Sequence, residues 1–143
     1  MIDGIRVAEA YTGYGRDVVD VDLLKRVEIL KGPSSALYGS DGLAGAISYI
    51  TKDASDLADF GESYFSVNTS YDEDNEQTKV GFIAARVGEN IETLLQVTSR
   101  ELSQLELHDD ATQELDPFDG EQTSILAKFQ FNLSESVDAT LTL

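Results

Sequence analysis

The sequence contains no cysteine, and only 10 of its 143 residues are lysine or arginine, against 27 aspartates and glutamates, which gives a net charge of −17. Without thiols, neither a disulfide framework nor a thiolate metal site can form. The acidic balance argues against a nucleic-acid partner, because phosphates need a basic face. No run approaches the roughly 20 apolar residues of a transmembrane helix, and the first residues lack the basic and apolar stretches of a signal peptide.

The motifs of common enzymes are also missing from the sequence. It has no Gly-Lys-Ser/Thr phosphate loop, no nucleophile elbow and no Ser-His-Asp arrangement. Residues 72–76 carry four acidic side chains, but they lack the glycine and the downstream glutamate of a calcium loop. We therefore expect no enzyme, no catalytic residues and no metal site.

The acidic residues are concentrated in the second part of the chain. Residues 1–60 carry 10 acidic and 6 basic side chains, whereas residues 61–143 carry 17 and 4. This shift in composition predicts a domain boundary near residue 60. We expect one domain over residues 1–52, a linker over 53–61 and a second domain over 62–143.

The first domain reads as a compact mixture of short helices and strands. An aspartate precedes an apolar stretch that ends in two basic residues, which is typical of a short capped helix. A short strand that stops at Gly32-Pro33 follows it. The expected elements are a strand fragment over 2–7, a loop over 8–20, a helix over 20–26, strands over 27–30 and 46–51, and a helical turn over 35–38.

The second domain shows strict alternation of apolar and polar residues, the pattern of strands with two different faces. We expect strands over 64–71, 79–87, 91–100, 124–133 and 137–143. Their connections alternate between acidic loops, over 72–77 and 101–121, and tight turns, over 88–90 and 134–136. This rhythm is typical of a transmembrane β-barrel with long outer loops, although a soluble antiparallel sandwich alternates in the same way.

One stretch resembles a known family. The sequence of residues 27–47, VEILKGPSSALYGSDGLAGAI, closely resembles the last part of the plug domain of TonB-dependent outer-membrane receptors. The flanking DLLKRVEI, SDGLAG and TKD, at residues 22–29, 40–45 and 51–53, are similar to the haem/haemoglobin receptor branch. The resemblance implies an α+β plug fragment followed by antiparallel transmembrane β-barrel strands, an incomplete barrel of about five strands.

The same resemblance implies a function for the whole receptor. The protein would lie in the cell outer membrane of a Gram-negative bacterium, in contact with lipid. It would take up haem or haem-protein iron, with energy from the TonB complex acting through a segment missing from this chain. Haem would be cargo, with no tightly bound cofactor. A ferric siderophore or cobalamin is an alternative cargo, and a soluble β-rich binding or adhesion module is the alternative class.

The resemblance also suggests site residues. Charged side chains would lock the plug to the barrel wall, with Glu28 and Lys31 on the plug side; the alternative is an exposed pair of little energetic value. Wall candidates on the polar faces of their strands are Glu92, Arg100 and Lys128.

Two further groups of candidates lie in or near loops. Aromatic and basic side chains could stack on haem or pair with a propionate, although ordinary loop packing explains them equally well; these are Tyr11, Tyr14, Arg16 and the single histidine, His108, which is more simply a solvated residue. The backbone motif of the plug needs positive φ or close packing at its glycines, and consists of Gly32, Pro33, Tyr38, Gly39, Gly42 and Gly45.

Overall fold

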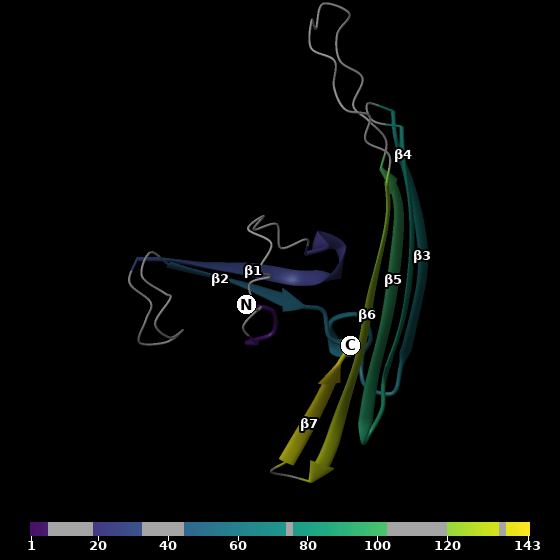
Figure 1. The fold of residues 1–143 in the computed structure, drawn as a ribbon. Helices are drawn as coiled ribbons and strands as arrows, with labels where there is room; N and C mark the ends of the chain where they lie inside the picture. The colour runs from purple at the N-terminus through teal and green to yellow at the C-terminus, as the bar shows by residue number, and fades with distance from the viewer. Residues whose placement is uncertain (6–18, 33–44, 74–75, 103–119, 135–136) are drawn as a thin grey trace, which may run out of the picture. The chain divides into compact units, whose positions relative to one another are not determined.

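The computed structural model describes residues 1–5, 19–32, 45–73, 76–102, 120–134 and 137–143 (Figure 1). The chain divides into two compact units, Met1–Lys52 and Asp53–Leu143. Residues 53–61, which we expected to form a linker, belong to the second unit. Within the described ranges, no helix is long and apolar enough to cross a membrane.

The first unit is built on one antiparallel strand pair, β1 (Leu24–Lys31) and β2 (Gly45–Thr51). A short 3₁₀ helix, η1 (Val21–Leu23), precedes β1, and the side chain of Asp20 accepts a hydrogen bond of 2.9 Å from the backbone N–H of Asp22. The expected helix over 20–26 is therefore wrong beyond Leu23. A helix this short gains few hydrogen bonds for its nucleation cost, whereas β1 pairs with β2 from Leu24 to Lys31, with one irregularity between Leu24 and Arg26.

The expected strand over residues 2–7 is also wrong in its described part. Asp3 and Gly4 both have positive φ, 46° and 79°, and the backbones of Ile2 and Ile5 exchange hydrogen bonds of 2.9 and 2.8 Å across them. Such a pair of positive φ values defines a tight turn, which glycine favours. The turn places Ile2 beside Tyr49 of β2, to which it forms a parallel bridge.

The second unit is a five-stranded antiparallel sheet in the order β3-β4-β5-β6-β7 (Figure 1). Each strand pairs with its neighbour in sequence, so the sheet is a meander that does not close into a barrel. All five strands that the alternation predicted are confirmed, each within a few residues of its expected ends. Their bounds are β3 (Ser63–Asp72), β4 (Gln77–Val87), β5 (Ile91–Leu102), β6 (Gly120–Ser134) and β7 (Val137–Thr142).

The expected α+β character of the plug is visible only in part. The helical elements among the described residues are η1 and a second 3₁₀ helix, η2 (Ala54–Asp56). The helical turn expected over 35–38 lies outside the described residues. What the structure describes is therefore mostly sheet.

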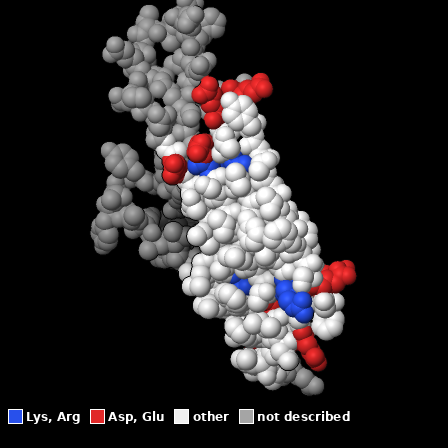
Figure 2. Space-filling view, turned by 90° about the vertical axis from the view of Figure 1, so that its right-hand side faces the viewer, with Lys and Arg blue, Asp and Glu red and all other residues white. Residues whose placement is uncertain are grey.

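The two faces of the five-stranded sheet differ in polarity, and the exposed face is the apolar one. Register places Val67 opposite Phe82 and Phe82 opposite Val97 on one face, and on this outer face Phe65 is 68% and Val67 60% exposed. Figure 2 shows a broad uncharged band on this side, with charged side chains toward its two ends. Apolar residues thus cover the exposed face, whereas a water-soluble sheet normally turns them inward.

The opposite, inner face of the sheet carries most of the buried side chains. They include three polar ones, Gln96, Thr98 and Lys128. Next to them lies a small apolar core, which is made of Ala54, Ile83, Ala85, Val87, Leu94 and Leu126. Because η2 packs against β4 and β5, Ala54 from η2 joins this core and fixes the start of the unit to the sheet.

Gly45 offers a test of the strand pair in the first unit. Its φ is 145°, and a Cβ there would overlap the carbonyl oxygen of Leu30 on β1. Gly45→Ala should therefore weaken the β1–β2 pairing by roughly 1–3 kcal/mol, measured as faster hydrogen exchange of the β1 amides. Gly32→Ala is the matched control, because Gly32 also has a positive φ, 106°, but open space around its Cβ position. Equal acceleration in both variants would show that the overlap with Leu30 has no effect.

Candidate functional site

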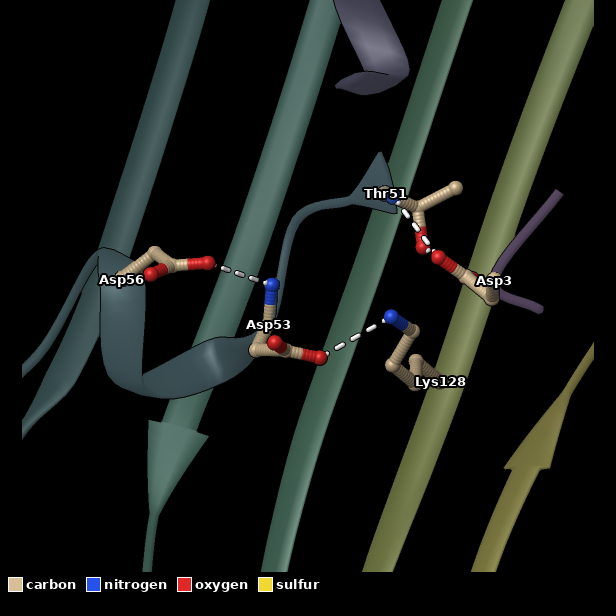
Figure 3. A network of polar contacts seen from close by, with 5 residues as sticks. All are labelled: Asp3, Thr51, Asp53, Asp56 and Lys128. Carbon is tan, nitrogen blue, oxygen red and sulfur yellow. Dashed lines mark hydrogen bonds and ion pairs between the residues drawn. The ribbon is translucent and has the colours of Figure 1, made fainter. Parts of the chain in front are cut away.

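A partly buried ion pair joins the first residue of the second unit to its sheet. The Lys128 ammonium on β6 lies 2.9 Å from Oδ1 of Asp53 (Figure 3). The Lys128 side chain is 6% exposed and that of Asp53 27%. A buried ammonium needs such an anionic partner, because its desolvation is otherwise uncompensated. We call these two residues, together with Asp56, the inner-face clamp.

Local structure holds Asp53 in the position that Lys128 needs. The backbone N–H of Asp53 donates a 2.8 Å hydrogen bond to the carboxylate of Asp56 (Figure 3), and the N–H of Asp56 donates to the carbonyl of Asp53 at 3.2 Å. Ala54, which lies between them, is buried in the core. The segment is thus fixed by two hydrogen bonds, one ion pair and one packed side chain.

Alternation along β6 brings Lys128 to the inner face. It lies opposite Leu94 of β5 and Thr142 of β7, and Leu94 is almost fully buried. With apolar neighbours and little water, the attraction between opposite charges is stronger than at a surface. A change of register by one residue would turn Lys128 to the apolar outer face and remove the contact.

The residues just before Asp53 are bonded within the first unit. The N–H and the hydroxyl of Thr51 donate to the carboxylate of Asp3, at 2.8 and 2.5 Å (Figure 3). The N–H of Lys52 donates to the carbonyl of Leu23 at 3.1 Å, and its ammonium to that of Asp22 at 2.5 Å. The Thr-Lys-Asp sequence therefore divides its polar contacts, two residues bonding within the first unit and the third within the second.

The five proposed locking residues lie on three strands, β1 of the first unit and β5 and β6 of the second. Glu28 lies on β1, where it forms a half-exposed ion pair of 2.7 Å with Arg26, and Lys31 is the exposed last residue of the same strand. Register places Glu92, Arg100 and Lys128 together on the inner face of the sheet. Locking of Glu28 or Lys31 to the wall residues stays a prediction.

Asp53 is the residue that reasoning from sequence missed. In the sequence, Asp53 is only the last residue of the TKD segment, and that resemblance assigns it no role. The signal that could have indicated it is the spacing of Asp53 and Asp56, since an acidic residue at a helix start followed by another three positions later is typical of a capped turn. Its pairing with a lysine 75 positions away in sequence has no local signal.

The other candidates lie largely outside the described residues. This holds for the cargo candidates Tyr11, Tyr14, Arg16 and His108, and for Pro33, Tyr38, Gly39 and Gly42 of the backbone motif. The two described glycines of that motif, Gly32 and Gly45, have positive φ. In the part of the chain that the structure describes, no group of three or more His, Cys, Asp or Glu side chains could hold a metal ion.

Comparison with known proteins gives the chain its class and then its family. Residues 1–46 match the family model described as the TonB-dependent Receptor Plug Domain, which makes the chain part of a plug-bearing receptor. The chain belongs to the TonB-dependent receptors.

The relatives by sequence come from several bacteria. The chain is similar to "Hemoglobin-binding protein A" of Haemophilus influenzae, with 31% identity over 98% of this chain and 16% of the relative. It is also similar to the "Hemin receptor" of Yersinia enterocolitica, with 49% identity over 40% of this chain and 8% of the relative, and to the "Vitamin B12 transporter BtuB" of Vibrio vulnificus, with 45% identity over 36% of this chain and 8% of the relative. The chain thus spans less than a fifth of the length of these relatives.

Loss of the clamp should destabilise the second unit more than loss of an exposed pair. Asp53→Ala removes the carboxylate that lies 2.9 Å from the buried Lys128 ammonium and should cost about 3–5 kcal/mol. Lys128→Met should cost less, because an apolar side chain fits the buried site and the partly exposed Asp53 carboxylate stays hydrated. Both costs can be measured as the free energy of unfolding in denaturant.

The control for this prediction is the ion pair on β1. Glu28→Ala removes one partner of an exposed pair and should cost less than about 1 kcal/mol. Equal costs for Asp53→Ala and Glu28→Ala would contradict a special role of the buried pair.

Proposed function

We propose that this chain is part of an outer-membrane receptor of a Gram-negative bacterium that takes up haem, or iron from a haem protein, with energy from the TonB complex. The observation that carries the proposal is a sheet whose outer face is apolar and exposed and whose inner face holds polar side chains beside a small apolar core, in a chain whose first 46 residues match a plug domain. Strands that face lipid on one side and a polar lumen on the other need this arrangement.

The ends of the sheet support a membrane-spanning orientation. Glu101 and Glu121 lie directly opposite each other on the outer face, a like-charge pair that is unfavourable unless water screens it. At the other end, β4 and β5 are joined by only three residues, 88–90. Outer-membrane sheets have such short turns on the periplasmic side and longer loops outside, so we place the Glu101 end toward the exterior.

The cargo follows from the names of the relatives. The relative aligned along nearly the whole chain is named for haemoglobin binding, and another is named a hemin receptor. The relative named for vitamin B12 aligns over only 36% of the chain. Haem or a haem protein is therefore the favoured cargo, and cobalamin the second candidate. The relatives are named as binding proteins, receptors and a transporter, which supports a function without catalysis.

A soluble binding module fits the outer face poorly. Phe65, Val67 and Ile125 are each at least 60% exposed on the same side of the sheet. A contiguous apolar surface of this kind is rare on a monomeric soluble protein, but lipid would cover it at no cost in hydration.

A charge placed in the middle of this surface distinguishes lipid from water. Val67 and Tyr71 are 60% and 62% exposed on the outer face of the same strand, Val67 near its middle and Tyr71 near its end. If lipid covers the face, Val67→Arg should cost about 2–4 kcal/mol and Tyr71→Arg about 0–1 kcal/mol, measured as free energies of unfolding in phospholipid vesicles. Similar small costs for both variants would favour the soluble module.

Growth on defined iron sources tests the cargo. The protein, expressed from its complete gene in a Gram-negative host without haem receptors, should support growth on haem or haemoglobin as the sole iron source. The growth should disappear when the host lacks a functional TonB complex. Uptake of labelled cyanocobalamin, but no growth on haem, would assign the second candidate cargo.

A further inference from the structure

The outer face of the five-stranded sheet contains a shallow depression that the transport function does not use. Its volume is 550 Å³, and it crosses β3, β4, β5 and β6. The apolar side chains around it belong to Phe65, Ala84, Leu95, Ala127 and Phe129, and the positively charged residue in its lining is Arg86. An apolar floor with a single cation beside it is the shape of a site for an amphiphile.

Strand register explains the depression. One row across the sheet reads Phe65, Ala84, Leu95, Ala127, so that large and small side chains alternate. The next row reads Ser63, Arg86, Thr93, Phe129, in which short and long side chains again alternate. Small side chains in neighbouring rows leave a hollow, and the rings of Phe65 and Phe129 stand at its two sides. An extended acyl chain has the width and chemistry to fill such a hollow.

Arg86 gives the depression its polar end. Its guanidinium donates a 3.0 Å hydrogen bond to the hydroxyl of Ser63, the residue directly opposite on β3. This bond uses one Nη atom and directs the planar guanidinium across the strand pair toward β3. The arginine itself stays exposed. Arginine in this setting still has donors available for a phosphate, which it binds with two parallel hydrogen bonds.

We propose that this depression is a binding site for an anionic phospholipid of the periplasmic leaflet. One acyl chain lies over the row of Ala84 and Ala127, and the phosphate binds Arg86. Arg86 is two residues from Gly88, where the short β4–β5 turn begins, so the headgroup end lies on the turn side of the sheet. Acidic residues lie at both ends of the sheet, Glu101 and Glu121 at one and Glu62 and Glu89 near Arg86 at the other, so the contact with the headgroup depends on Arg86 itself. The proposal depends on the membrane placement given above and not on the cargo.

The charge of the headgroup determines which lipid the site prefers, because all bilayer lipids have similar acyl chains. Bulk lipid already solvates the apolar face, so a chain gains little by entering the hollow except close packing. The ionic contact with Arg86 adds a preference for a headgroup with net negative charge. Phosphatidylglycerol should therefore be enriched at the protein over phosphatidylcholine.

Native mass spectrometry can measure that enrichment. The protein is released from nanodiscs that contain equal amounts of phosphatidylglycerol and phosphatidylcholine, and the retained lipids are counted. The unmodified protein should retain phosphatidylglycerol several-fold more than phosphatidylcholine. Arg86→Gln should bring the ratio close to one, and Arg86→Lys should keep part of the preference because the charge remains.

Two alanines provide the matched pair for the hollow. Ala127→Leu fills the depression and should lower the amount of retained phosphatidylglycerol. Ala139→Leu adds the same volume to the same face on β7, outside the depression, and should leave retention unchanged. Circular dichroism of each variant checks that the sheet is intact.

Three results would overturn the lipid site. They are an unchanged ratio in Arg86→Gln, equal effects of the two leucine variants, and selective retention of lipid A, which belongs to the opposite leaflet. Each is independent of haem uptake. A receptor that grows on haem without enriching phosphatidylglycerol loses only this site, and one that enriches the lipid without growing on haem loses only the proposed cargo.

Discussion

The second unit depends on one constraint, the fixed register of five antiparallel strands. Because successive side chains in a strand point to opposite faces, every pairing from Val67–Phe82 to Val97–Ile125 assigns a whole set of residues to one side. A shift of one residue in any strand would exchange its polar and apolar sets. In the proposed membrane placement, such a shift would turn charged side chains toward lipid and apolar side chains toward water, so both environments favour the observed register.

Register also explains why the clamp exists. It commits Lys128 to the inner face beside Leu94, where a lone ammonium would be strongly disfavoured. Asp53 compensates this charge from the residue at which the second unit begins, and Asp56 and Ala54 hold it there. The ion pair thus compensates the desolvation of Lys128 and at the same time fixes the first residue of the second unit against the sheet. Such a pair adds little free energy of folding compared with an apolar pair of similar size, but it fixes the position of Asp53 relative to β6.

The sequence could predict the elements whose signals are local. Alternation predicts all five strands of the second unit, because each strand faces two different environments and its polar and apolar residues alternate accordingly. Local signals fail where tertiary pairing overrides local preference. Lys25 and Arg26 have the residue types of a helix end, but both lie in β1, where Arg26 pairs with Ile50 of β2 and a register irregularity falls at Lys25. Asp3-Gly4 has the residue types of a tight turn, and its positive φ values override the strand expected over residues 2–7. The Asp53–Lys128 pair depends on a contact between distant residues, which no local pattern records.

The two ends of the sheet differ in the length of their connections and not in the sign of their charge. Glu101 and Glu121 lie opposite each other at one end, and Glu62 and Glu89 lie near Arg86 at the other. Acidic side chains at both ends would hold both in contact with water, because a carboxylate is costly to move into hydrocarbon. In the proposed membrane placement, the charges therefore fix the depth of the sheet, and its direction follows from the short β4–β5 turn.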